Sequence, residues 1–123
     1  MAGFRLSLQA ERDVEAILEW SHDQFGERVC LRYEALLTQA MLDVADDPDR
    51  PGTQKRPELA SGASTYHIRH SQDRVSRSIG RIRKPRHFLI FRVADDGRLE
   101  ISRVLHDGMD PTRHLPPGYR SSD

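Results

Sequence analysis

Residues 86–106 read RHFLIFRVADDGRLEISRVLH and contain two strand-like patterns separated by a turn signal. Its apolar run predicts a central strand over residues 87–93. The next four residues, Ala94 to Gly97, are typical of a tight turn. Leu99, Ile101 and Leu105 then recur on one face of a second strand, 98–105. The two strands are therefore expected to pair as an antiparallel hairpin.

The N-terminal half has a different period. Residues 4–8 alternate apolar and polar side chains, which predicts a short strand. Apolar residues then recur at helical spacing over 10–25 and again over 29–44. Ser7 or Gln9 suits the start of the first helix, and Gly26 suits its end. Because so few residues separate the two helices, they are expected to form an antiparallel hairpin.

The middle of the chain is less regular. Residues 46–63 carry five prolines and glycines and are expected to form a connection, with room for a turn of helix. Residues 64–70 alternate and predict a strand. Residues 71–86 fit either a helix or a strand. The predicted fold class is α+β: an N-terminal strand, a helical hairpin and then a three-stranded antiparallel sheet.

The length of 123 residues fits one domain, expected over 1–115, with a flexible tail over 116–123. With 37% hydrophobic and 31% charged residues, the composition excludes a membrane protein and a disordered chain. The N-terminus has no signal-peptide pattern. The single cysteine, Cys30, excludes an internal disulfide and fits a reducing cytoplasm. Its place on the apolar stripe of the second helix favours a buried structural thiol over a nucleophile.

The net charge of zero hides a strong segregation of charge. Residues 9–49 carry eleven acids and three bases, a local balance of −8. Residues 69–92 carry eight bases and one acid, a balance of +7. The basic segment either recognises an acidic partner or is a solvated loop that pairs with the acidic half.

No metal or cofactor site is expected. His67 and His70 fall on a predicted strand, where they would point to opposite faces, and no HExxH, CxxC or phosphate-binding loop motif occurs.

His106 follows the last predicted strand and lies near Arg103. Such a pair could perform acid–base chemistry on a phosphodiester, although a structural role in the C-terminal turn is the favoured interpretation. Arg103 shares a row with apolar residues and must either reach water or find an anion, such as Asp107, Asp110 or a partner's acid. Trp20 lies off the main helical stripe and either packs on the second helix or belongs to an exposed apolar patch.

Several segments together resemble ParE-type toxins of the RelE/ParE toxin–antitoxin superfamily. The resemblance covers residues 3–70 and 85–115 and is most specific at Arg103 to Leu115. Its other segments are Phe4–Ser7, Ala10–Val14, Phe25–Arg28 with Tyr33, Asp47–Pro48 and Arg86–Val93.

The resemblance implies a cytoplasmic toxin with a helical hairpin on an antiparallel sheet, bound in a hetero-oligomer by a ParD-like antitoxin with an acidic or amphipathic C-terminal segment. It implies inhibition of DNA gyrase by protein–protein binding, without catalysis. RelE-like relatives instead cut mRNA on the ribosome without a metal, and a toxin-derived binding module without toxicity is a third reading. The arginine-rich insertion 71–84 departs from the family pattern, in which a tight turn joins these strands.

Three sets of candidate residues follow. For the target, the candidates are Arg103, His106, Met109 and Arg113. For the antitoxin, they are Trp20, Arg69, Arg81, Arg83, Arg86 and Arg92. In the ribonuclease alternative, His106, Arg103 and Arg86 would be catalytic.

Overall fold

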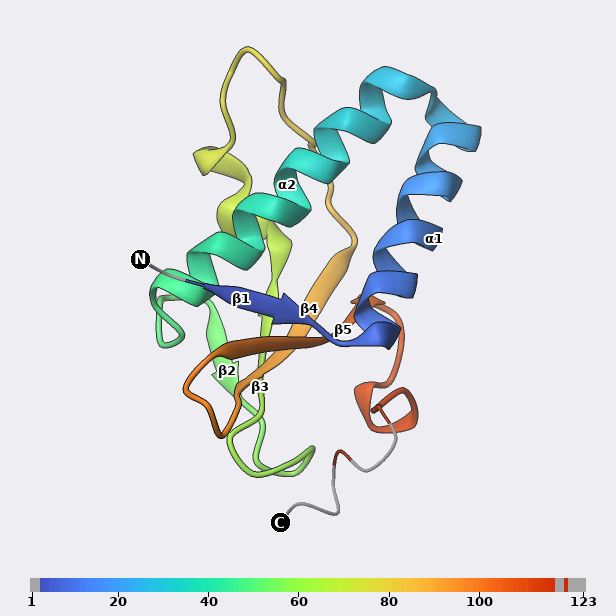
Figure 1. Ribbon diagram of the computed structural model, residues 1–123. Coiled ribbons are helices and arrows are strands. Elements are labelled where there is room, and N and C mark those ends of the chain that lie inside the picture. Colours follow the sequence, from blue (N-terminus) through green and yellow to red (C-terminus); the bar gives the residue numbers. More distant parts are fainter. Residues whose placement is uncertain (1–2, 117–118, 120–123) are drawn as a thin grey trace.

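The computed structural model describes residues 3–116 and residue 119 (Figure 1). Its helices and strands are β1 (Phe4–Leu6), α1 (Leu8–Phe25), α2 (Glu27–Asp46), β2 (Thr53–Lys55), β3 (Ser64–His67), the 3-10 helix η1 (Ile68–Arg74), β4 (His87–Val93), β5 (Leu99–His106) and the 3-10 helix η2 (Pro111–Arg113). The predicted N-terminal strand and helical hairpin are confirmed. Neither α1 nor α2 is both long and apolar enough to cross a membrane, and no other described helix is.

The two predicted helix boundaries have clear local causes. The Ser7 hydroxyl accepts a hydrogen bond from the backbone N–H of Ala10, which satisfies a free donor at the start of α1. Gly26 ends α1 with a positive φ of 89°, a conformation that glycine adopts without strain. Gly26 is also the one residue between the helices, so α2 turns back directly along α1.

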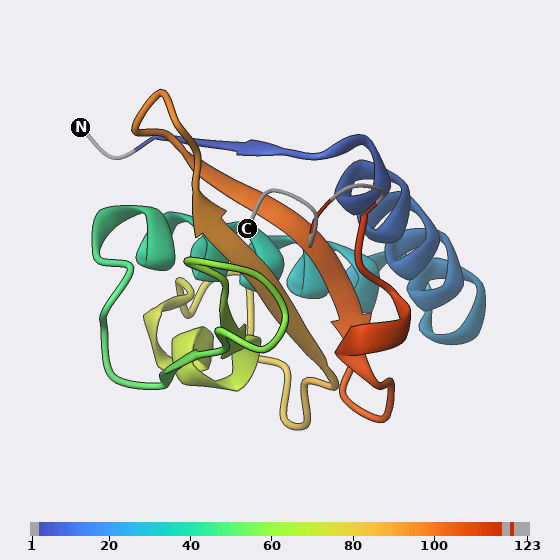
Figure 2. The same ribbon diagram turned by 90° about the horizontal axis from the view of Figure 1, so that it is seen from below.

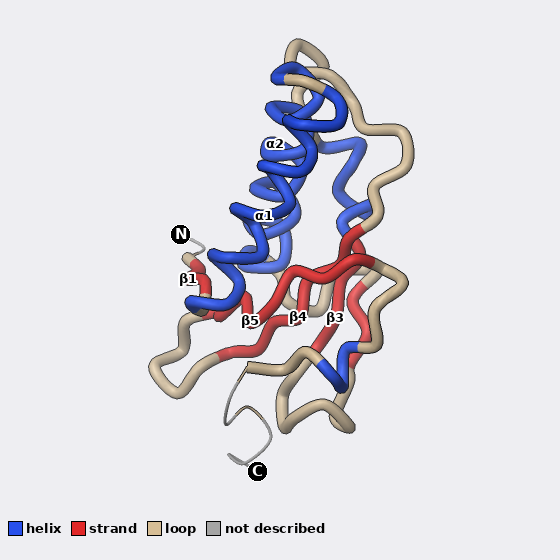
Figure 3. Tube along the Cα trace, turned by 90° about the vertical axis from the view of Figure 1, so that its right-hand side faces the viewer, coloured by secondary structure: helices blue, strands red, loops and turns tan. Residues whose placement is uncertain are grey.

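The sheet has five strands in the order β1-β5-β4-β3-β2, with both helices on one side of it (Figures 1 and 3). β1 pairs with β5 in parallel, with Phe4 opposite Leu99, and the remaining pairs are antiparallel. The expected three-stranded antiparallel sheet is therefore too small. It lacked the parallel edge strand β1, and it lacked β2, which forms inside the expected connection 46–63.

The predicted strand 64–70 is too long, because β3 ends at His67 and the chain enters η1. Asp43, a buried carboxylate on α2, holds η1 in place. It accepts hydrogen bonds from the Ser71 hydroxyl at 2.7 Å and from Nε of Arg74 at 2.8 Å. The Ser71 hydroxyl also contacts the Tyr66 hydroxyl at 2.8 Å. Because of these contacts, the chain leaves the sheet after β3 and packs against α2.

Beyond η1, the insertion follows α2 as an irregular loop, neither the helix nor the strand that its sequence allowed. Nε of Arg32 on α2 donates a hydrogen bond to the Ile79 carbonyl at 3.2 Å. Gly80 has a φ of 102°, and a Cβ there would lie 2.4 Å from Nε of Arg32. The backbone therefore approaches the arginine more closely than another residue would allow.

A β-bulge at Ser102 corrects the expected face of β5. Phe91 lies opposite Ile101, whereas the preceding residue Ile90 lies opposite Arg103, so Ser102 is the extra residue. Leu99 and Ile101 consequently face the helices, while Arg103 and Leu105 face the other side. The single row of Leu99, Ile101, Arg103 and Leu105 predicted from strict alternation is wrong.

The sheet separates two apolar cores. The larger one lies between the sheet and the helices, where Leu36, Leu37, Leu89 and Phe91 are almost fully buried. The smaller one, on the other face, contains Leu59, Ala60, Ala63, Ile90, Leu105 and Tyr119.

Figure 2 shows the loop before β3 and the segment after β5 on this smaller side of the sheet. Tyr119, a residue of the expected flexible tail, is only 2% exposed. Its hydroxyl accepts a hydrogen bond from Ser102 at 3.0 Å, so this tail residue is packed. The rest of that tail beyond Pro116 lies outside the described residues.

Candidate functional site

The ends of β4 and β5 border a pocket beneath the two helices, which we call the Trp20 pocket. It has a volume of about 290 Å³. Its lining comes from α1, α2, the insertion and the two strand ends, and comprises Ile17, Trp20, Ser21, Phe25, Val29, Tyr33, Ile82, Lys84, Arg86, His87 and His106. The walls are mostly apolar, as is typical of sites that receive an apolar group.

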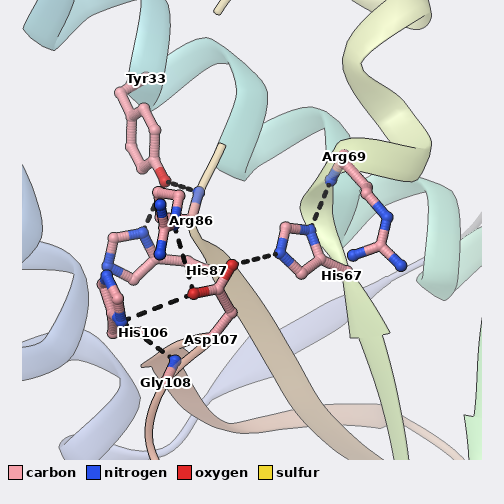
Figure 4. Close-up of polar contacts among 8 residues, drawn as sticks. All are labelled: Tyr33, His67, Arg69, Arg86, His87, His106, Asp107 and Gly108. Atoms are coloured by element: carbon pink, nitrogen blue, oxygen red, sulfur yellow. Dashed lines mark hydrogen bonds and ion pairs between the residues drawn. The ribbon is translucent and has the colours of Figure 1, made fainter. Parts of the chain in front are cut away.

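Tyr33 and His87 form a hydrogen-bonded pair in this lining (Figure 4). The Tyr33 hydroxyl lies 2.5 Å from Nδ1 of His87 and accepts a hydrogen bond from the backbone N–H of Arg86 at 3.1 Å. Burial raises the pKa of Tyr33 to about 12. Burial, followed by the neighbouring His106, lowers the pKa of His87 to about 4. Both groups are therefore neutral at pH 7, and a hydrogen bond joins the tyrosine hydroxyl to Nδ1.

Asp107, directly after β5, lies beside basic groups from β3, from β5 and from the residue that precedes β4 (Figure 4). Its carboxylate accepts hydrogen bonds from Nε2 of His67 at 3.2 Å and from Nε of Arg86 at 3.3 Å. Nδ1 of His106 lies 3.6 Å away. Burial opposes ionisation of Asp107, but His67, Arg86 and His106 outweigh it and lower the pKa of the carboxyl.

His106 is the last residue of β5, so the strand ends one residue later than expected, and His106 lies on the helix side of the sheet. The backbone N–H of Gly108 donates a hydrogen bond to its Nδ1 at 3.1 Å. This contact orders the turn after β5, as the favoured interpretation of His106 predicted. His106 also lines the Trp20 pocket, and the ring of His87 stands edge-on to it at 5.5 Å.

Arg103 lies on the opposite face of the sheet, where the bulge at Ser102 directs it. Its Nε and Nη2 donate to the two Asp13 carboxylate oxygens at 2.7 and 2.8 Å, and its Nη1 donates to the His114 carbonyl at 2.6 Å. The hydrogen bonds to Asp13 raise the pKa of Arg103. The expectation that Asp107 or Asp110 is its partner is therefore wrong. Of the three ribonuclease candidates, Arg86 and His106 lie together and Arg103 lies apart.

The remaining target candidates lie in the segment after β5. Met109 is 45% exposed and borders a polar depression with His67 and Arg69. Arg113 is exposed and lies 4.0 Å from Asp110, whose side chain caps η2 through Thr112. Met109 and Arg113 are thus accessible, whereas Arg103 is committed to Asp13.

The antitoxin candidates fall into separate places. Trp20 and Arg86 line the Trp20 pocket, and the Trp20 ring stands edge-on to Phe25, the last residue of α1, at 5.5 Å. Arg81 and Arg83 are exposed on the insertion, where Arg81 pairs with Asp73 at 2.6 Å. The other two candidates are Arg69, beside the polar depression, and Arg92, which lies 4.2 Å over the Tyr119 ring on the smaller-core side.

Trp20 and Phe25 are 57% and 59% exposed, which supports the expectation of an apolar patch at this position. Cys30 is half-buried between the helices, with Sγ 3.4 Å from the Leu18 carbonyl, and not fully buried as expected. His70 lies on η1 and not on a strand. Within the described part of the chain, no three His, Cys, Asp or Glu side chains are grouped as metal ligands.

Sequence reasoning missed Tyr33, His87 and Asp13 as members of polar networks. Tyr33 fits the apolar stripe of α2, so only its hydroxyl could have suggested a polar contact. His87 precedes the apolar run of β4, and Asp13 lies among other acids on α1. Neither position carries a local signal of its partner.

Comparison with protein families matches residues 4–111 to the ParE toxin of the type II toxin-antitoxin system parDE. Comparison with curated proteins gives no significant match. Among solved structures, a chain described as the chromosomal ParDE TA system from P. aeruginosa is similar in fold, with a TM-score of 0.58 and 18% identity over 86% of this chain and 96% of that one. The chain therefore belongs to the ParE toxin family and is the toxin of a type II toxin–antitoxin system.

Proposed function

We propose that this toxin acts by binding DNA gyrase through the segment that follows β5, and that this action needs no chemical step by the toxin. Gyrase inhibition is the role expected of ParE-type toxins. The observation that favours binding over catalysis is the position of Arg103. Its guanidinium is held by Asp13 of α1 and by the His114 carbonyl, and it does not line the pocket that His106 lines, so the expected phosphate-binding group does not converge with the expected acid–base group.

The accessible side chains of this segment, Met109 and Arg113, are the proposed target contacts. Exposed methionine and arginine side chains are both enriched in protein interfaces, and arginine is frequent among the residues that dominate binding. The loop that carries them is held by Asp107 at one end and by the Asp110 cap of η2 at the other.

A supercoiling assay with purified toxin, with and without its antitoxin, tests the proposal. Met109→Asp is expected to weaken gyrase inhibition strongly. Val93→Asp, a matched change of an exposed apolar residue at the far end of β4, is expected to leave it intact. Equal inhibition by the Met109 variant and the unaltered toxin would show that this segment does not touch the target.

A ribonuclease activity is the second candidate, because Arg86, Asp107 and His106 form one cluster beside the pocket. An RNA substrate incubated in parallel with the gyrase reaction separates the two. Cut RNA with normal supercoiling, abolished by His106→Gln, would replace the gyrase proposal. A toxin that affects neither substrate and is harmless in cells would support the third reading, a binding module without toxicity.

We further propose that the cognate antitoxin approaches the basic segment 69–92 with carboxylates. Arginine suits this role because its planar fork binds carboxylates through two hydrogen bonds. The affinity is then expected to weaken as salt concentration rises. An affinity that is insensitive to salt would indicate that apolar burial dominates the complex instead.

A further inference from the structure

The Trp20 pocket has a feature that the family fold alone does not supply, because one of its walls comes from the insertion. Ile82 and Lys84 of the insertion line it together with residues of α1 and α2. The anchors that hold the insertion against α2 are the Asp43 contacts of η1 and the hydrogen bond from Arg32 to Ile79. This wall is therefore attached to the helices and not a free loop.

The pocket combines apolar walls with positively charged side chains. Its walls are apolar, and the Trp20 and Phe25 rings stand open beside it, more than half exposed. Its charged lining residues are Lys84 and Arg86, and none of the lining residues is an acid. Tyr33 and His87 form a hydrogen bond with each other and are both neutral, so they add no charge to the lining of the pocket. An apolar group beside a negative charge complements this arrangement.

The volume of the pocket limits the kind of ligand that it can receive. A volume of about 290 Å³ lies at the lower limit of small-molecule sites, which span about 300–1,000 Å³. One large apolar side chain inserted from a peptide fits such a volume. The neighbouring carboxylates of that peptide would then meet Lys84 and Arg86 at the rim.

We propose that the Trp20 pocket receives one large apolar side chain of the cognate antitoxin, flanked by carboxylates, and that Ile82 and Lys84 make the pocket selective for that antitoxin. This inference rests on the antitoxin partnership and not on the identity of the target. Charge complementarity favours this occupant, because Lys84 and Arg86 line the pocket without an acid among the lining residues, and carboxylates of an antitoxin would pair with them.

The pocket contains its own probe, because Trp20 is the single tryptophan of the chain. Toxin labelled with 5-fluorotryptophan gives one fluorine resonance, whatever the sequence of the unlabelled antitoxin. Addition of the antitoxin is expected to shift this resonance in proportion to complex formation. A resonance that is the same in the free toxin and in the saturated complex would overturn the proposal.

Two matched pairs of variants then measure the contribution of the pocket to the Kd for the full-length antitoxin. Trp20→Ala is expected to raise the Kd by about tenfold or more, as for a central apolar anchor. Leu31→Ala, which removes a similarly exposed apolar side chain from α2 outside the pocket, should change it by less than about twofold. Because both side chains are mostly exposed, neither change is expected to alter the unfolding temperature.

Lys84→Glu is expected to raise the Kd by about fivefold at low salt, with a smaller loss at high salt. Lys55→Glu makes the same charge reversal at an exposed lysine on β2, outside segment 69–92 and away from the pocket, and should have little effect. Equal losses within either pair would overturn the proposal. So would a fluorine shift caused by gyrase and not by the antitoxin, since the pocket would then belong to the target. A toxin that fails to inhibit gyrase leaves these antitoxin measurements fully interpretable.

Discussion

At the middle of β5, Arg103 and Asp13 form a short two-pronged ion pair, whereas at the end of the strand Asp107 collects His67 and Arg86 over longer distances. The first pair has hydrogen bonds of 2.7 and 2.8 Å, and its side chains are 19% and 15% exposed. The second has contacts of 3.2 and 3.3 Å, and the Arg86 side chain is 60% exposed. One region ties α1 to the sheet, and the other is a surface cluster beside a pocket.

The role of a residue therefore depends on its surroundings and not on its type alone. Both regions contain an arginine and an aspartate, and both arginines were catalytic candidates in the ribonuclease reading. Their surroundings separate them: a buried charge must be matched by a fixed partner, whereas water can replace the partner of an exposed one. Four experiments bear on this contrast.

The largest expected effect is at the middle of β5. Arg103→Met leaves the Asp13 carboxylate with the Val104 backbone N–H but without its guanidinium. We expect the free energy of unfolding to fall by about 2–4 kcal/mol. Urea unfolding measures it, with Arg83→Met on the exposed insertion as the control. A loss no larger than the control's would mean that this ion pair is as dispensable as a surface one.

The next largest effect is a loss of stability at low pH, and it concerns His87, which lines the Trp20 pocket. The pKa of His87 is about 4 in the folded protein, against 6.5 for a free histidine. Between these values the unfolded chain binds more protons, so stability is complete above pH 6.5 and falls as the pH drops towards 4. The loss is at most about 3 kcal/mol at 1.36 kcal/mol per pKa unit, and smaller where solvent reaches the ring.

Urea unfolding at several pH values tests this prediction. His87→Gln keeps an acceptor for Tyr33 but cannot titrate, so its stability should change much less over the same range. Parallel pH profiles for the variant and the unaltered protein would show that other groups cause the dependence.

A smaller effect is expected from Tyr33→Phe. The change removes the hydroxyl that hydrogen-bonds to His87 and accepts from the Arg86 N–H, both in a buried place. We expect a loss of about 1–2 kcal/mol and faster hydrogen exchange of the Arg86 amide. Tyr119→Phe, which removes a hydroxyl bonded to Ser102, should leave that amide unchanged. Faster exchange in both variants would indicate a general loosening of the sheet.

The smallest effect on stability is expected at Asp107. Its partners can turn to water, so Asp107→Asn should barely move the unfolding midpoint. The pKa of His67, which burial lowers and Asp107 partly restores, should fall further in this variant. Histidine titration by NMR measures it, and Asp110→Asn is the control. An unchanged pKa of His67 in Asp107→Asn would mean that the side chains of His67 and Asp107 do not interact in solution.

The sequence predicted what depends on local periodicity. The helical hairpin, its start near Ser7 or Gln9, its end at Gly26 and the β4–β5 hairpin all follow from spacing and from residues with strong local preferences. The parallel pairing of β1 with β5 has no such signal, because the partners are far apart in the chain. The bulge at Ser102 has none either, since one extra residue in a strand looks like any other polar position.

The candidate site was predicted in part, for the same reason. His106 and Arg86 were named together only in the ribonuclease alternative, and the structure brings both beside Asp107. Arg103 was placed with them because alternation alone cannot reveal the change of face at the bulge. Tyr33 and His87 escaped notice because their partnership depends on how α2 crosses the sheet.

The parallel pairing of β1 with β5 also has a consequence for the timing of synthesis. The first strand leaves the ribosome early, but its neighbour in the sheet begins only at Leu99. The helical hairpin can form while translation continues, whereas the sheet edge cannot close until nearly all of the described chain has been made. A nascent chain therefore carries the helices before it carries the finished sheet, and the surface proposed to meet the target is assembled last.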